Sequence, residues 1–253
     1  MMKTLNTLKK WWVILAVALA GCTGYGSLNV EAIDSNQSIN GSMAQYGQNS
    51  NHLFVLLPHQ RRIASYRFGA DGLLTKGPLA YGRDMETLFP TEDYLFVGTM
   101  EGVSIYDLKN ELSNFEEIGQ FRHIRSCDPV VVQGNYAYST LRSGTVCGST
   151  VNRLDVIDIS DITNPQGVGA VQMSDPHGLG VDGNLLFVCE GAKGLKVFSL
   201  ENPIEPILIK HFQNIHAYDL IPANKILIAI GDNGILQYDY TDPENIQQIS
   251  QLL

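Results

Sequence analysis

Tryptophan, catalytic signature motifs and helical periodicity are all scarce in this sequence. Its two tryptophans, Trp11 and Trp12, lie close to the N-terminus. There is no Gly-x-Ser-x-Gly elbow, no Gly-rich phosphate loop before a helix and no Cys-x-x-Cys pair, which argues against several common classes of enzyme. Beyond residue 40, short runs of Val, Ile, Leu, Tyr and Phe alternate with Gly, Asn, Asp and Pro. This pattern predicts an all-β fold.

Positive charge is also in short supply. Lys and Arg number 17 against 26 Asp and Glu, which gives a formal net charge of −9. Because a surface of this sign repels a phosphate backbone, we expect no nucleic-acid partner.

The sequence also has no hydrophobic run long enough to span a bilayer comfortably. The longest, WWVILAVALAG, ends at Gly21. Lys3, Lys9 and Lys10 precede it, as in an export signal. We therefore assign residues 1–21 to a signal peptide, and we expect residues 22–41, rich in Gly, Ser and Asn, to be a flexible tether.

The end of this signal, Leu19-Ala20-Gly21-Cys22, resembles the lipobox of bacterial lipoproteins. The resemblance implies that Cys22 becomes the lipidated first residue of a protein anchored to the membrane but not spanning it. Thr23, in place of Asp, favours the outer membrane, on its periplasmic or its outer surface. The alternative is a plain signal peptide or membrane anchor with a chance cysteine.

Residues 42–253 consist of a unit that occurs five times. One aromatic or Leu in the middle of an apolar run marks each copy, at intervals of 42, 42, 49 and 40 residues: Phe54, Phe96, Tyr138, Phe187 and Leu227. Each copy holds four short apolar runs separated by turns. Four antiparallel strands form a sheet that cannot bury both faces alone and so packs on its neighbours around an axis. We predict a five-bladed β-propeller of four-stranded antiparallel blades, closed into a wheel, with another repeat architecture such as a solenoid as the alternative.

Several of these runs resemble the LVIVD-repeat family of bacterial secreted and surface β-propellers. The resemblance rests on LDVID, VSIYD and ILQYD, followed by the turns DISDITNP and DYTDPENI. The first unit departs from the pattern, because RRIASYRFGADGLLTKGP lacks the Asp and Asn-Pro turn. The family implies a fold and a cell-surface location, and little about chemistry. We expect the turn residues Asp107, Asp158 and Asp239 to be structural, with carboxylates that accept backbone N–H groups.

The candidate site comes from aligned positions at one face of the propeller, where loops surround the central channel. Ten residues before each marker stand Ala44, Glu86, Asp128, His177 and Ala217. Glu86, Asp128 and His177, with His216 beside the fifth position, are predicted to converge and bind a polar ligand or a cation. The alternative is that each caps its own turn. No cofactor is expected; a divalent cation stays possible, although no local ligand spacing supports a metal. Other residues that the alignment places on this face are Glu101, Arg142, Arg153, Asp175, Glu190, Lys193 and Asp232.

Three cysteines remain after Cys22. Cys127 opens the third unit, and Cys147 lies in its enlarged loop on the same face. We predict a disulfide between them that closes a loop of about 20 residues and stabilises the fold by roughly 3 kcal/mol; two reduced thiols or a metal pair is the alternative. Cys189 sits within an apolar strand and is expected to be a buried free thiol.

The function that these features favour is binding without catalysis, by a lipid-anchored scaffold whose partner is a protein, a glycan or a small polar ligand. A hydrolase similar to glycoside hydrolases, with Glu86 and Asp128 as its acid pair, is the first alternative. A structural component of an envelope assembly is the second. The fold alone does not separate these three functions.

Overall fold

The computed structural model describes residues 41–252 apart from 110–111, 113–114, 124–128, 146 and 148. The chain divides into two compact units, residues 1–34 and 35–253, and all the described residues belong to the second unit. The predicted signal peptide, Cys22 and the tether up to residue 40 lie outside the described residues. So do Cys127 and Asp128.

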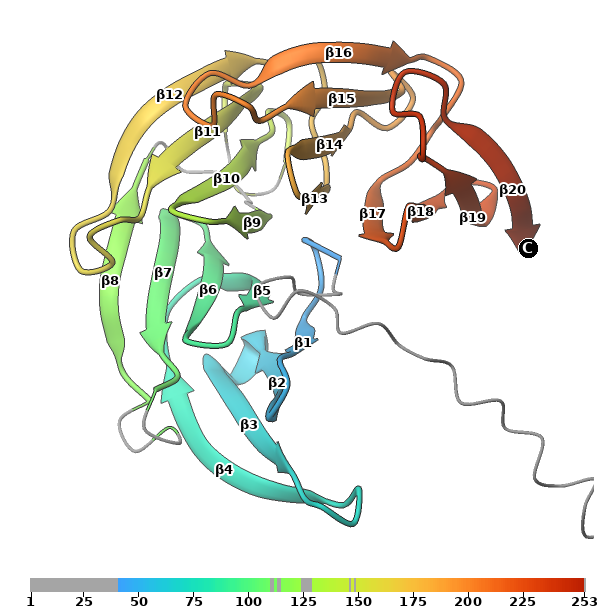
Figure 1. The fold of residues 1–253 in the computed structure, drawn as a ribbon. Coiled ribbons are helices and arrows are strands. Elements are labelled where there is room, and N and C mark those ends of the chain that lie inside the picture. Colours follow the sequence, from blue (N-terminus) through green and yellow to red (C-terminus); the bar gives the residue numbers. More distant parts are fainter. Residues whose placement is uncertain are drawn as a thin grey trace, which may run out of the picture. The chain divides into compact units, whose positions relative to one another are not determined.

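Within the described ranges, twenty strands form five four-stranded antiparallel sheets, which confirms the predicted fold class (Figure 1). The first blade comprises β1 (Tyr46–Gln48), β2 (His52–Leu57), β3 (Arg62–Phe68) and β4 (Leu74–Tyr81), with a short 3-10 helix at Pro58–Gln60. The second comprises β5 (Met85–Pro90), β6 (Tyr94–Thr99), β7 (Gly102–Asp107) and β8 (Glu117–Arg122). The third comprises β9 (Val130–Gln133), β10 (Tyr136–Leu141), β11 (Arg153–Asp158) and β12 (Gln166–Gln172). The fourth comprises β13 (Leu179–Asp182), β14 (Leu185–Cys189), β15 (Leu195–Ser199) and β16 (Ile207–Phe212). The fifth comprises β17 (Asp219–Ala223), β18 (Ile226–Gly231), β19 (Gly234–Asp239) and β20 (Gln247–Leu252).

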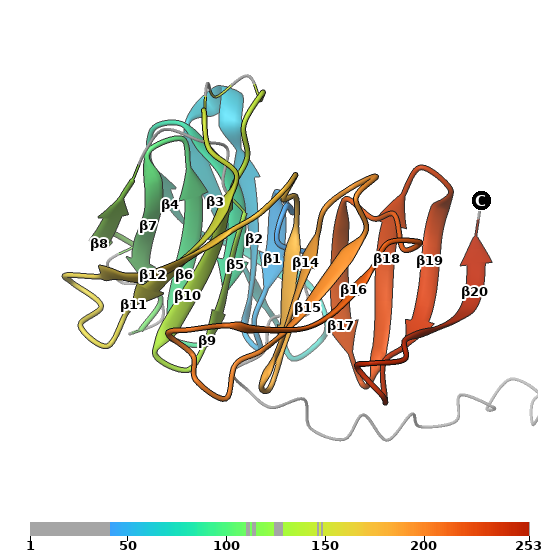
Figure 2. The same cartoon turned by 90° about the horizontal axis from the view of Figure 1, so that it is seen from above.

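Strands within each blade run between two faces, which carry the turns (Figure 2). One face holds the starts of the innermost strands and the turns between second and third strands, and we call it the mouth face. The opposite face holds the other two turns of each blade. This division follows directly from the antiparallel order of the four strands.

The blades follow one another around an arc, with the innermost strands nearest the centre (Figure 1). Strand β1 packs on β5, β5 on β9, β9 on β13, and β13 on β17. Among the described residues, no strand of the fifth blade packs extensively on a strand of the first. A closed wheel requires the fifth blade to pack directly on the first, and this part of the expectation is therefore wrong.

A polar turn at residues 41–44 joins blades near the centre. The Ser42 hydroxyl donates to Asp219 Oδ1 at 3.1 Å and accepts from the Leu179 N–H at 2.7 Å. The Ala44 carbonyl accepts from the Leu88 N–H at 3.0 Å. These bonds link the second, fourth and fifth blades through the segment that leads into β1.

The core lies between the blades because successive residues of a strand point to opposite faces of its sheet. In β14, Leu186 and Val188 belong to the apolar cluster shared with the third blade. Their neighbours Phe187 and Cys189 belong to the cluster shared with the fifth blade. Cys189 is free and fully buried, as predicted.

The repeated Asp turns form as expected. The carboxylates of Asp107, Asp158 and Asp239 each accept the N–H of the residue two positions later, at 2.8–2.9 Å. These bonds lower the pKa of Asp158 and of Asp239, since they stabilise the charged carboxylate.

The predicted register is wrong by one residue in the fifth blade. Phe187 pairs with Gly180 and Val197, and the equivalent residue, which pairs with Ile221 and Gln237, is Ile228. The cause is the turn before the marker. Gly183 holds the left-handed conformation there in the fourth blade (φ 55°), and Asn224 holds it in the fifth (φ 51°). Asn tolerates this conformation better than most non-glycine residues, so Asn224 aligns with Gly183 and not with Asn184.

Candidate functional site

The corrected register places Tyr218, not Ala217, at the position equivalent to His177. The N–H of His177 donates to the Cys189 carbonyl at 2.8 Å, and the N–H of Tyr218 donates to the Ile230 carbonyl at 2.7 Å. Their rings lie 5.0 Å apart between centroids, so these two equivalent positions of the fourth and fifth blades are in contact.

Asp175 bridges two basic groups on the mouth face. Its Oδ1 lies 2.7 Å from Nε of Arg142, and its Oδ2 lies 3.4 Å from Nε2 of His177. Nη1 of Arg142 lies 3.2 Å from Nδ1 of His177. Because a guanidinium only donates, Nδ1 must accept, and the network assigns the proton of the neutral ring to Nε2.

The electrostatic surroundings favour the neutral form of His177. Its side chain is only 7% exposed. Burial lowers the pKa of the imidazole, and the charge of Arg142 lowers it further, while Asp175 opposes both effects. His177 is therefore a fixed, uncharged member of the triangle that it forms with Arg142 and Asp175.

A fully buried carboxylate, Glu190, holds the loop that carries Asp175. Its Oε1 accepts the N–H groups of Ser174 at 2.6 Å and Asp175 at 3.3 Å. Its Oε2 lies 2.9 Å from Nζ of Lys196 on β15. A buried charge is tolerated when it is paired and hydrogen-bonded in this way.

Tyr218 extends the group toward the fifth blade. Its hydroxyl donates to the carboxylate of Asp232 in the β18–β19 turn, with both oxygens at 2.9 Å. This bond raises the pKa of Tyr218, because it stabilises the protonated phenol. We call the set of Arg142, Asp175, His177, Glu190, Tyr218 and Asp232 the mouth cluster.

Two other predicted site residues, Glu86 and His216, lie in the second and fifth repeat units. Glu86 lies in a bulge of β5, with its Oε1 3.2 Å from Sγ of Cys147. The exposed ring of His216 has Nε2 3.0 Å from the Gln213 carbonyl oxygen. The convergence of Glu86 and His216 with His177 stays a prediction. Asp128 and Cys127 lie outside the described residues, and the disulfide to Cys147 stays a prediction.

The part of the chain that the structure describes holds no group of three or more His, Cys, Asp or Glu side chains arranged to ligate a metal ion. It contains no helix that is long and apolar enough to cross a membrane.

The fold and its repeat define the class of this protein. Five four-stranded blades make it a β-propeller, and the sequence profile of the LVIVD repeat matches residues 124–172. The protein is a β-propeller with a match to the LVIVD repeat in its third blade. A search of curated proteins found no match.

Solved structures with similar folds come from several bacteria. Apo AztD from Citrobacter koseri is 15% identical, with a TM-score of 0.63 over 83% of this chain and 61% of its own. A functionally unknown protein from Desulfotomaculum acetoxidans is 14% identical, with a TM-score of 0.64 over 80% and 66%. The periplasmic gluconolactonase PpgL from Pseudomonas aeruginosa is 16% identical, with a TM-score of 0.57 over 80% and 66%. The chain thus spans 61–66% of the length of these structures, and at such identities the likeness concerns the fold.

The alignment of repeats found four members of the mouth cluster besides His177: Arg142, Asp175, Glu190 and Asp232. It missed Tyr218, because it paired Asn224 with Asn184. The sequence does contain a signal for the correct alignment. Asn224 lies in the turn before a strand, where Gly takes the left-handed conformation in the two preceding units, and Asn is a candidate for the same conformation.

Proposed function

We propose that the mouth cluster binds a small hydroxyl-rich ligand of the carbohydrate kind without catalysis, on a protein anchored by lipid at Cys22 to the outer membrane. The support is a rim of mixed chemistry on one face. Arg142 and Asp175 are each about one-third exposed and offer a donor fork and a carboxylate. Tyr218 adds an exposed ring edge and Asp232 a second carboxylate. Hydroxyl groups need both donors and acceptors, and this rim supplies them.

The observation that carries the proposal is the preorganisation of Asp175. Buried Glu190 holds its backbone, and Arg142 and His177 hold its two oxygens. A rim that is fixed before the ligand arrives loses less conformational entropy on binding. The same contacts disfavour catalysis by His177, because the lone pair of Nδ1 already accepts from Arg142 and is not available to take a proton from water.

A second function, hydrolysis of a sugar lactone, has one specific argument in its favour. The similar fold from Pseudomonas aeruginosa is named a gluconolactonase. In that reaction water adds to the lactone carbonyl and the ring C–O bond breaks, which leaves a hydroxy acid. For this chain the function requires His177 to leave Arg142 and act as a base.

One pair of probes separates the two functions. Calorimetric titration of the full chain with gluconate tests binding, and acid release from glucono-1,5-lactone at constant pH tests hydrolysis. We expect gluconate to bind and Arg142→Gln to weaken it by about tenfold or more, as for a lost charged hydrogen bond. Arg67→Gln, an exposed arginine on β3, is the matched control. No lactone turnover above the uncatalysed rate is expected. Turnover that disappears in His177→Gln would establish the hydrolase instead, and failure of gluconate to bind would refute the proposal.

A further inference from the structure

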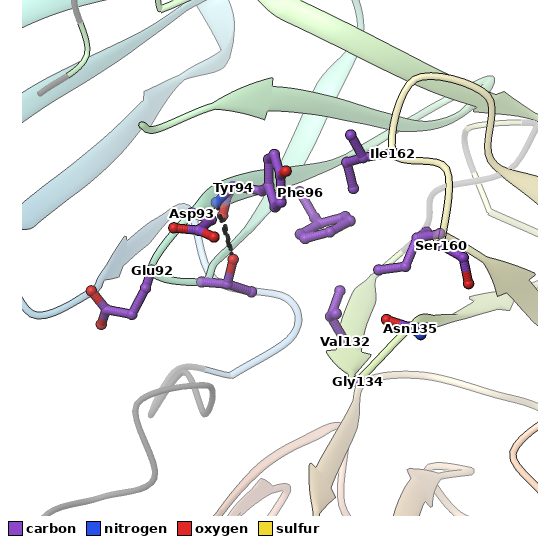
Figure 3. A pocket seen from close by; sticks show the side chains of 11 residues that line it. Glu92, Asp93, Tyr94, Phe96, Val132, Gly134, Asn135, Ser160 and Ile162 are labelled. Atoms are coloured by element: carbon purple, nitrogen blue, oxygen red, sulfur yellow. Dashed lines mark hydrogen bonds between the residues drawn. The ribbon is translucent and has the colours of Figure 1, made fainter. Parts of the chain in front are cut away.

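A cavity of about 570 Å³ lies between the second and third blades, on the face opposite the mouth face. Phe96 of β6, Val132 of β9 and Ile162 of the β11–β12 turn supply its apolar walls (Figure 3). Polar side chains of three turns surround them: Asp93, Asn135 and Ser160. The volume is within the range of small-ligand sites, about 300–1,000 Å³.

The same place is filled by aromatic groups at the next two junctions between blades. Between the third and fourth blades, the hydroxyl of Tyr138 donates to the Pro203 carbonyl at 3.1 Å. Between the fourth and fifth, the rings of Phe187 and Tyr240 pack edge to face with centroids 5.0 Å apart.

The junction between the second and third blades has neither the tyrosine hydroxyl nor the second aromatic ring that fills this place at the next two junctions. Phe96 pairs with Ile105 as Tyr138 pairs with Val156, so the two aromatic residues are equivalent, but Phe96 has no hydroxyl. Ile159 of the third blade is equivalent to Tyr240 of the fifth. Each donates its N–H to a carbonyl in the turn between the first and second strands of its own blade. The cavity is thus a property of this junction and not of the repeat.

The charge at this junction is distinctive too. The β5–β6 turn carries Glu92 and Asp93, whereas the third and fourth blades have Gly-Asn in the same turn. Glu92 accepts the N–H and hydroxyl of Ser50 at 3.1 Å and 2.5 Å. Asp93 lies 3.8 Å from Nζ of Lys109. Of the described residues, no Lys or Arg lines the cavity, and Glu92 and Asp93 are the charged residues in its lining.

The geometry points to a primary amine with a compact apolar body as the ligand of this cavity. The body packs on Phe96, Val132 and Ile162, where it displaces water from apolar walls. The protonated amine lies at the rim beside Asp93, where a charge-assisted hydrogen bond to the carboxylate is available. This site is separate from the mouth cluster, so the inference does not depend on the proposed function.

The first test uses two probes with the same ring and opposite charge. Calorimetric titration of the full chain with 2-phenylethylamine at pH 7 is expected to show binding, and 3-phenylpropionate is expected to show none. Asp93→Asn should weaken amine binding by about tenfold or more, because one charged partner is lost. Asn occupies this turn position in the next two blades, so the variant keeps its turn. Asp71→Asn, in the exposed β3–β4 turn, should bind the amine as the parent does.

The second test fills the cavity without removing its charge. Phe96→Tyr adds the hydroxyl that Tyr138 carries at the neighbouring junction. We expect this variant to melt at the parent temperature or above it and to lose amine binding. Equal binding of the two probes, unchanged binding by either Asp93→Asn or Phe96→Tyr, or no binding of the amine at millimolar concentration would each overturn the assignment.

Discussion

The half-buried carboxylate of Asp219 connects the turn at residues 41–44 to the blades. Its oxygens accept the Ser42 hydroxyl and the Met43 N–H at 3.1 and 3.2 Å. A Cβ at Gly41 or at Gly178 would clash with its side chain, so only glycine fits on either side. Burial raises the pKa of Asp219 to about 6 in spite of these bonds. This residue is consequently a source of pH dependence in the fold.

The sign of that dependence follows from linkage. Because the folded-state pKa is higher than that of an unfolded Asp, the folded protein holds an extra proton between about pH 4 and pH 6. The free energy of unfolding that Asp219 contributes therefore falls as pH rises through this window, by about 3 kcal/mol in total. Asp219→Asn should remove this part of the pH dependence.

Urea denaturation of the parent and of Asp219→Asn at pH 4, 5, 6 and 7 measures this difference. Asp71→Asn, which removes an exposed carboxylate, controls for the loss of one negative charge. A difference between parent and Asp219→Asn that stays constant from pH 4 to pH 7 would contradict the prediction.

At the residue scale, the sequence was informative about which face holds the polar groups and less so about which of them meet. Register alone places four of the polar residues on the mouth face: Arg142, Asp175, Glu190 and Asp232. Their contacts depend on loop conformation, which periodicity does not encode. Glu86 shows this limit: a bulge in β5 between Met85 and Thr87 alters the register on which its predicted position rested.

At the scale of elements, the turn between the third and fourth strands ties the third blade to the second and the fourth blade to the third. The carbonyl of Ile162 in the third blade lies over Gly119 on β8 of the second. The carbonyl of Ile204 in the fourth blade lies over Gly169 on β12 of the third. Both glycines leave room for a neighbouring backbone, which is a recognised use of glycine within strands.

This arrangement predicts that a methyl group at position 119 destabilises the fold. In Gly119→Ala the new Cβ would clash with the backbone carbonyl of Ile162, which cannot move without shifting its turn. We expect the free energy of unfolding to fall by about 1–3 kcal/mol, the usual effect of overpacking. Gly167→Ala is the matched control on another fourth strand, because its Cβ would meet only the ring of Phe121 at 3.1 Å. Urea denaturation of both variants checks the prediction, which fails if the two changes cost the same.

Most strands were predictable, because alternation and turn residues specify them locally. The first blade is the instructive exception. It lacks the Asp turn of the second, third and fifth units, yet β3 and β4 form and pair with an irregular register between Ala64 and Tyr66. Here packing on the second blade, through Phe54, Leu56 and Ile63, supports strands that the local sequence marks weakly.

At the scale of the whole set of blades, closure was the property that the repeat did not encode. Equivalent blades can follow an arc with any number of members, and periodicity gives no angle between them. Among the residues that the structure describes, no blade covers the outer face of the fifth blade, unlike that of the fourth. Ile230 and Ile235 pair on that face and are 52% and 42% exposed. At the equivalent positions of the fourth blade, Cys189 and Leu195 pair and are almost fully buried.

Two matched substitutions test whether this face is uncovered. Leu195→Thr places a hydroxyl within the core between the fourth and fifth blades and should lower the free energy of unfolding by about 2–4 kcal/mol. Ile235→Thr makes a closely similar change at the equivalent strand position of the open face and should cost less than about 1 kcal/mol, since its side chain is already near water. Thr suits a strand nearly as well as Ile, so strand propensity contributes little to the contrast. Urea denaturation at several protein concentrations measures both values. An Ile235→Thr cost as large as that of Leu195→Thr would mean that another surface buries the outer face of the fifth blade in solution, and a cost that grows with protein concentration would identify that surface as a second copy of the chain.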